Sequence, residues 1–159
     1  AADWLRHRGW PALMVQGEAA PQQLLERFRE TPGAILLGTQ SFWEGVDVRG
    51  PALSCVMIDR LPFASPGDPV LQARAAWLRD QGRNPFGEYQ LPEAIIGLRQ
   101  GVGRLIRDAA DRGVLVLGDT RIMSKPYGRL FRASLPPMPL VRDPERINLF
   151  FADQSSTSS

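Results

Sequence analysis

The sequence predicts an α/β domain with a mainly parallel sheet flanked by helices, and three observations favour this class. Short apolar runs alternate with amphipathic stretches along the chain. Several of these runs are apolar enough for strands buried between helices, as in parallel sheets. The 159 residues, 43% apolar and 23% charged, fit one globular domain of ordinary size. Functional groups gather beyond the carboxyl ends of such strands, so a site is expected in the loops that follow them.

The first half of the chain contains three predicted strands and one predicted helix. Strands are expected at residues 12–15, 34–38 and 53–58. The third is apolar enough to be covered on both faces. A helix is expected at residues 21–30, because Pro21 suits a first turn and Leu24, Leu25 and Phe28 recur at helical spacing.

The second half alternates in the same way. Asp68 and Pro69 form an N-cap pair that begins a helix ending near Asp80, with Gly82 as its stop. Further elements are a loop at 84–91, a helix at 92–107, a strand at 114–117 and a helix at 126–133.

The chain is expected to divide into a domain at residues 1–143 and a partly disordered tail at residues 144–159. The apolar segment 147–151 is interpreted first as an edge strand packed on the sheet. The alternative is a docking peptide for a partner. Residues 1–7 resemble the middle of a helix, so we expect the chain to be truncated upstream.

Composition excludes several classes of protein. Of the 19 basic residues 18 are arginine, and the only lysine, Lys125, follows no phosphate-binding glycine loop. A self-sufficient P-loop ATPase is therefore excluded. The single Cys55 cannot form an internal disulfide or a cysteine-based metal centre, and we expect no metal site and a reducing, cytoplasmic location. No apolar run is long enough to cross a membrane.

Basic residues are patterned along the predicted helix at 92–107. Gln100, Gly103, Arg104 and Arg107 are spaced i, i+3, i+4 and i+7, so they share one face opposite the apolar residues. Two guanidinium groups one turn apart match a polyphosphate. An ordinary solvated basic face is an equally good interpretation of the spacing. A dinucleotide-binding glycine motif is a poor one, because Ile106 stands where a third glycine is needed.

A polar loop follows the predicted strand at 34–38. Thr39 and Ser41 offer hydroxyls that can bind a phosphate, and Glu44 and Asp47 bracket Gly45, which permits a tight turn. The alternative is a capped turn with aromatic residues in the core.

Together these two segments resemble a known family. The stretch SFWEGVDV, followed about 50 residues later by QGVGRLIR, is similar to motifs V and VI of superfamily 2 helicases. The intervening LSCVMIDRLPFASPGDPV and the later RGVLVLGDTRIMSKPYG also resemble the XPD-like DNA helicases, specifically their bacterial DinG/YoaA type, nearest the YoaA branch.

The resemblance implies a RecA-like three-layer fold and the role of a second motor domain. A first domain would hold ATP with Mg²⁺, and an iron–sulfur cluster is possible only in that missing part. Gln100, Arg104 and Arg107 match motif VI, whose arginines are expected to reach the γ-phosphate from across the cleft. The isolated chain is expected to be inactive.

Other residues take expected roles from the same resemblance. Glu44, Gly45 and Asp47 match motif V, and with Gly103 they are expected on the nucleotide side. Thr39, Gln40 and Ser41 lie where the family contacts DNA, and Arg60 and Arg121 are weaker DNA candidates.

The implied partners are single-stranded or forked DNA, the first helicase domain and, as an alternative function, the chi subunit of the clamp loader. Phe150 and Phe151 are the candidates for docking that subunit. The implied location is the nucleoid, and the implied polarity is 5′ to 3′.

Overall fold

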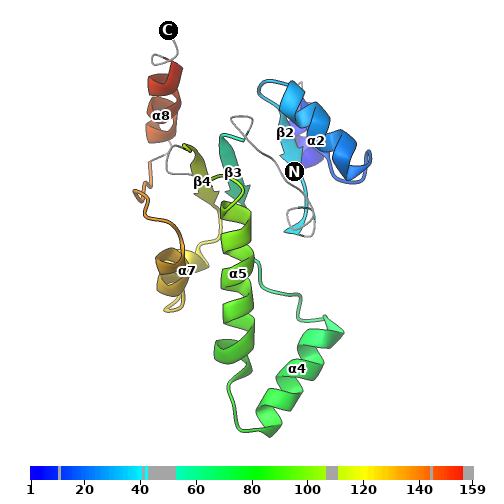
Figure 1. Ribbon diagram of the computed structural model, residues 1–159, viewed down its shortest axis with the longest axis vertical. Helices are drawn as coiled ribbons and strands as arrows, with labels where there is room; N and C mark the ends of the chain where they lie inside the picture. The colour runs from blue at the N-terminus through cyan, green and yellow to red at the C-terminus, as the bar shows by residue number, and fades with distance from the viewer. Residues whose placement is uncertain (11, 41, 43–52, 107–110, 144, 156–159) are drawn as a thin grey trace.

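The computed structural model describes the chain except for residues 11, 41, 43–52, 107–110, 144 and 156–159. The described elements are, in chain order, α1 (Ala2–His7), β1 (Leu13–Val15), α2 (Pro21–Glu30), β2 (Ile35–Leu37), β3 (Cys55–Ile58), α4 (Pro69–Asp80), the π-helix η1 (Phe86–Gln90), α5 (Leu91–Val102), β4 (Val114–Leu117), α6 (Arg121–Ser124), α7 (Gly128–Ser134) and α8 (Glu145–Ser155). Figure 1 shows α5 at the centre, with the β3–β4 pair at one end of it and α4 as an arm beside the other.

The strands pair in parallel, which confirms the α/β, RecA-like class. β1 pairs with β2, with Leu13 opposite Ile35, and β3 pairs with β4, with Cys55 opposite Val114. In each pair both carboxyl ends lie at the same edge, so the loops that follow the paired strands are brought together.

The β1–β2 pair rests on α2. This helix begins at Pro21, as predicted, and buries Leu24, Leu25 and Phe28. With Met14 and Phe42 these side chains form one buried cluster. Fully burying an aliphatic or aromatic side chain contributes about 1.5–3 kcal/mol, so this face holds α2 on the strands.

The β3–β4 pair rests on α5. Ala94, Leu98 and Val102 recur every four residues on the face of α5 that is buried, and they pack in one cluster with Ile58 and Phe131. Phe131 and Leu98 are completely buried. This cluster fixes α5 beneath the strands and α7 beside it.

Helix α4 begins as predicted. The Asp68 carboxylate accepts a hydrogen bond from the backbone N–H of Leu71 at 2.9 Å, which satisfies one of the free donors of the first turn. The segment expected to be a loop at 84–91 instead contains η1, which runs directly into α5. Asn84 Oδ1 accepts from the N–H groups of Phe86 and Gly87 and so starts the helical turn there.

Two further predictions about this half are corrected. Strand β3 is not covered on both faces: Ile58 is buried, but Met57 is 68% exposed, because α5 packs on one side of the pair only. Helix α5 ends at Val102 rather than 107, with Gly103 as its C-cap. A helical turn nevertheless continues, since the Ile106 N–H donates to the carbonyl of Val102 at 3.2 Å.

The end of the chain is also corrected. The segment expected as an edge strand at 147–151 lies inside α8, which spans Glu145–Ser155. Ile147, Phe150 and Phe151 are spaced i, i+3 and i+4, which is a helical period. Asp143 Oδ1 accepts from the Glu145 N–H at 3.0 Å and begins this helix. No helix in the described ranges is long and apolar enough to cross a membrane.

Candidate functional site at the carboxyl ends of the strands

An open hollow of about 400 Å³ lies at the carboxyl ends of β3 and β4. Its lining consists of Asp59, Arg60, Gly118, Asp119, Thr120 and Arg121. Two of these residues follow β3 and four follow β4, so the parallel pairing alone brings them together. We call this feature the strand-end hollow.

Asp119 joins the two loops of the strand-end hollow. Its Oδ2 accepts from the backbone N–H of Leu61 at 2.8 Å, and its Oδ1 accepts from the backbone N–H of Arg121 at 3.0 Å. The Arg121 side chain donates from Nε to Oδ1 at 2.9 Å and from Nη2 to Oδ2 at 2.6 Å. This fork-to-carboxylate geometry is strong and directional.

The electrostatics of Asp119 follow from those bonds. The side-chain hydrogen bond from Arg121 holds the pKa of the Asp119 carboxyl well below its ordinary value, against the opposing effect of burial. The backbone N–H groups of Leu61 and Arg121 lower the pKa further. Only 8% of the Asp119 side chain is exposed, so a charged carboxylate is retained there by its donors.

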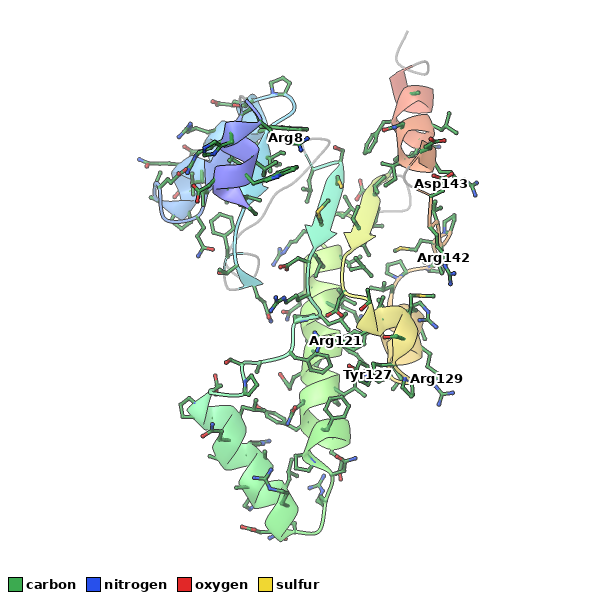
Figure 2. The ribbon with its side chains drawn as sticks, turned by 180° about the vertical axis from the view of Figure 1, so that it is seen from behind. Arg8, Arg121, Tyr127, Arg129, Arg142 and Asp143 are labelled. Atoms are coloured by element: carbon green, nitrogen blue, oxygen red, sulfur yellow. The ribbon has the colours of Figure 1, made fainter. Side chains whose placement is uncertain are left out.

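Arg121 is held on its other side by aromatic residues. Its Cζ lies 5.4 Å from the ring centroid of Phe63, a distance typical of a cation–π contact. Hydrogen bonding to Asp119 raises the pKa of Arg121, and the Tyr127 hydroxyl contributes in the same direction. Figure 2 shows Arg121 and Tyr127 close together between the strand ends and α7. The guanidinium is therefore fixed in place while 40% of the side chain stays exposed.

Arg60 lines the same hollow, but its side chain is not held in place by a described residue as that of Arg121 is. Arg60 and its neighbour Asp59 are both exposed. Among the residues that the structure describes, no hydrogen bond or ion pair holds either side chain. The structure thus brings together the two arginines, Arg60 and Arg121, that the sequence singled out as weaker candidates. It also adds Asp119, which sequence reasoning missed, although its place two residues after a strand and two before Arg121 was a usable signal.

The β1–β2 pair ends in neutral polar groups. Gln16, which follows β1, accepts at its Oε1 from the Thr39 backbone N–H at 2.8 Å and from the Thr39 hydroxyl at 2.9 Å. Gln40 lies against α5, since a Cβ placed on Gly97 would be 3.0 Å from Gln40 Nε2. Thr39 and Gln40 are both exposed. The predicted candidates Ser41, Glu44, Gly45 and Asp47 lie outside the described residues.

The residues predicted to contact phosphate lie at the C-terminal end of α5. Gln100 and Gly103 are exposed, and Arg104 is half-buried with its Nε shielded from solvent. The hydrogen bond from the Arg104 N–H to the carbonyl of Gly101 at 3.2 Å keeps Arg104 in the turn that prolongs the helix. The i, i+3, i+4 face of these three residues is therefore retained. Arg107 lies outside the described residues.

A second hollow, of about 350 Å³, lies beside this turn. It is lined by Arg99, Gly103, Ser134, Leu135 and Pro136. The exposed Arg99 was not a sequence candidate, because it lies one position off the predicted face.

The part of the chain that the structure describes has no group of three or more His, Cys, Asp or Glu residues placed to hold a metal ion. The Gln100 amide and the Arg104 guanidinium are groups that can donate hydrogen bonds to phosphate oxygens.

The two candidate docking residues lie on α8. The rings of Phe150 and Phe151 meet edge to face, with centroids 5.4 Å apart, and both residues are half-buried. Leu149 beside them is 65% exposed.

Comparison with known proteins agrees with the fold. Residues 2–138 match the family model described as the helicase C-terminal domain. The chain is 56% identical over 144 residues to the ATP-dependent DNA helicase YoaA of Escherichia coli, covering 91% of this chain and 23% of that protein. It is 46% identical to YoaA of Haemophilus influenzae, covering 96% of this chain and 24% of the relative.

Another relative is named DinG. The chain is 48% identical over 126 residues to the 3′-5′ exonuclease DinG of Bacillus subtilis, covering 78% of this chain and 14% of that protein. The chain thus spans a quarter or less of the length of these curated relatives. By its sequence and its parallel α/β fold, the chain belongs to the helicase C-terminal domain family and is a domain of the DinG/YoaA type.

Proposed function

We propose that this chain is the second motor domain of an ATP-dependent DNA helicase that acts in DNA repair or replication. The observation that carries the proposal is the match of residues 2–138 to the helicase C-terminal domain. Two relatives at 56% and 46% identity are named ATP-dependent DNA helicases. The protein acts in the cytoplasm on the nucleoid.

In this proposal the far end of α5 completes the ATP site. A first domain holds ATP with Mg²⁺, and Gln100, Arg104 and Arg107 approach the γ-phosphate from the second domain. The support is geometric: Gln100 and Arg104 lie on one face where α5 ends, beside the exposed Gly103. Arginine can neutralise the charge that develops on a transferring phosphoryl group without supplying the nucleophile.

Nucleic acid lies on the strand ends. Arg60 and Arg121 offer two cations for phosphates of a single strand, and Thr39 and Gln40, which follow the β1–β2 pair, offer neutral donors. Such contacts address the backbone, so binding is salt-dependent and largely independent of sequence. Closing and opening of the cleft with each ATP would shift this grip in the 5′ to 3′ direction.

The test uses the full-length polypeptide and its DNA-stimulated ATP hydrolysis. Arg104→Ala should lower the turnover rate by about 10³-fold or more, as expected for loss of an arginine finger. Arg99→Ala is the matched control, because it removes the same charge from an exposed residue of α5 five positions earlier in the chain. Normal hydrolysis by the Arg104 variant would exclude the arginine-finger role. The isolated chain should hydrolyse no ATP.

A docking function is the second candidate, and α8 is the observation that favours it. This helix exposes Leu149 beside the paired rings of Phe150 and Phe151. The clamp-loader chi subunit is the candidate partner. Leu149→Glu should abolish that binding in a pull-down with purified subunit while ATP hydrolysis is unchanged; retained binding would exclude this surface.

A further inference from the structure

The strand-end hollow contains two carboxylates, and they are not equivalent. Asp59 is exposed, and no described residue holds its carboxylate. Only 8% of the Asp119 side chain is exposed, and its carboxylate accepts five hydrogen bonds, one from Leu61 and four from Arg121. A buried carboxylate with this many donors acts on its neighbours rather than on solvent.

The bonds of Asp119 fix the Arg121 guanidinium and anchor the backbone next to Arg60. Its direct pairing with Nε and Nη2 sets the plane and direction of the Arg121 guanidinium, which the Phe63 ring then supports from one face. Its bond to the Leu61 N–H anchors the residue that follows Arg60. The bond spans 58 residues of sequence, so it ties the loop after β3 to the loop after β4.

We infer that Asp119 is a positioning residue for nucleic-acid binding: it holds Arg121 and the Arg60 loop so that the two cations face adjacent phosphates of one strand. This inference rests on the proposed function of the hollow. The chemistry recognised is a phosphodiester backbone, since the two arginines can only donate hydrogen bonds and the Thr120 hydroxyl can also donate one to a phosphate oxygen.

Loss of the Asp119 carboxylate should change DNA affinity in the direction opposite to that expected from charge repulsion alone. Removing a carboxylate from a site that binds phosphates should tighten binding if charge alone matters, because repulsion is lost. If Asp119 positions the arginines, its loss should weaken binding instead. Asp59→Asn and Asp119→Asn remove the same charge from the same hollow, so they form a matched pair.

The experiment measures the affinity of the full-length protein for single-stranded DNA oligonucleotides at several salt concentrations, without ATP. We expect Asp119→Asn to weaken binding about tenfold, and Asp59→Asn to tighten it, because a repulsive charge is lost. Arg121→Ala should weaken binding by a similar factor. The double variant Asp119→Asn/Arg121→Ala should bind no more weakly than Arg121→Ala alone, because both substitutions disrupt the same Asp119–Arg121 pair.

Other results would distinguish failure of the positioning role from failure of nucleic-acid binding in the hollow. If Asp119→Asn binds as tightly as the parent or more tightly, the positioning role is wrong. If Arg60→Ala and Arg121→Ala both bind as the parent does, nucleic acid does not use the hollow, and that part of the proposed function fails instead. If Asp119→Asn does not fold, Arg121→Lys replaces it. Lysine keeps the charge but cannot make the forked pair, so weaker binding supports positioning and unchanged binding overturns it.

Discussion

The two strand pairs share one geometry and end in different chemistry. Each is parallel and carries its candidate residues in the loops beyond the carboxyl ends. At the β1–β2 end, a neutral amide, Gln16, organises Thr39. At the β3–β4 end, a carboxylate, Asp119, organises Arg121. The comparison indicates that the parallel topology brings the two loops of each pair together, whereas the residues in those loops decide whether the strand ends present neutral or charged groups.

The largest expected effect is the loss of stability caused by substitutions in the two hydrophobic clusters that support these strand pairs. Phe131→Ala should destabilise the β3–β4 cluster by about 3–5 kcal/mol, and Leu24→Ala should destabilise the β1–β2 cluster by about 2–5 kcal/mol. Because the two clusters share no residue, the double variant should be additive to within about 0.5 kcal/mol in denaturant unfolding. A large coupling energy would mean that the two pairs form one core.

A smaller effect should appear with pH at the β3–β4 end alone. The pKa of Asp119 is lowered on folding, so its stabilisation is complete above its ordinary value of 3.8 and is lost as the pH falls further. Asp119→Asn should cost about 1–3 kcal/mol at neutral pH, through its lost charged hydrogen bonds. The gap between variant and parent, followed by denaturant unfolding at a series of pH values, should narrow below about pH 4. A constant gap would contradict the role of the ionised carboxylate.

Gln16→Ala should produce a loss of about 1 kcal/mol that does not change with pH. The change removes the acceptor of two Thr39 hydrogen bonds, and neither group ionises. The same unfolding series measures it. A pH-dependent loss here would show that the neutral end is coupled to a titrating group, and the contrast between the two ends would fail.

The smallest effect on stability is expected where the β2 loop meets α5. In Gly97→Ala the new Cβ would lie 3.0 Å from Gln40 Nε2 and 3.4 Å from Pro62 Cγ. Alanine favours a helix by about 1 kcal/mol over glycine, and the end of a flexible glutamine can move, so the net change should stay within about 1 kcal/mol. DNA affinity should fall although the thermal midpoint barely changes. Unchanged affinity would mean that the position of Gln40 is unimportant for binding.

Local signals in the sequence predicted most of the fold. Pro21, Asp68 and the strand-like runs placed α2, α4 and the strands, because capping and periodicity act within a few residues. The errors arose where the sequence does not show which face of a strand or helix packs against another element. Met57 looks as apolar as Ile58, yet only one of them faces α5. At 147–151 a short apolar run fitted both a strand and the helix that formed.

The site was predictable to a similar extent. Spacing predicted one face for Gln100, Gly103 and Arg104, whereas the common hollow of Arg60 and Arg121 became evident only from the structure. Asp119 was missed because its importance depends on the Leu61 N–H, 58 residues away in sequence. Such a contact has no local signature.

The close approach of Gln40 to Gly97 also bears on how two distant groups communicate. Gly97 lies three residues before Gln100 on α5, a rise of about 4.5 Å along the helix axis. With no side chain between the α5 backbone and Gln40, there is no cushion at that contact. If nucleic acid binds at Gln40, as proposed, a shift of that side chain would act directly on the α5 backbone, and the rigid helix would transmit the displacement to Gln100 and Arg104.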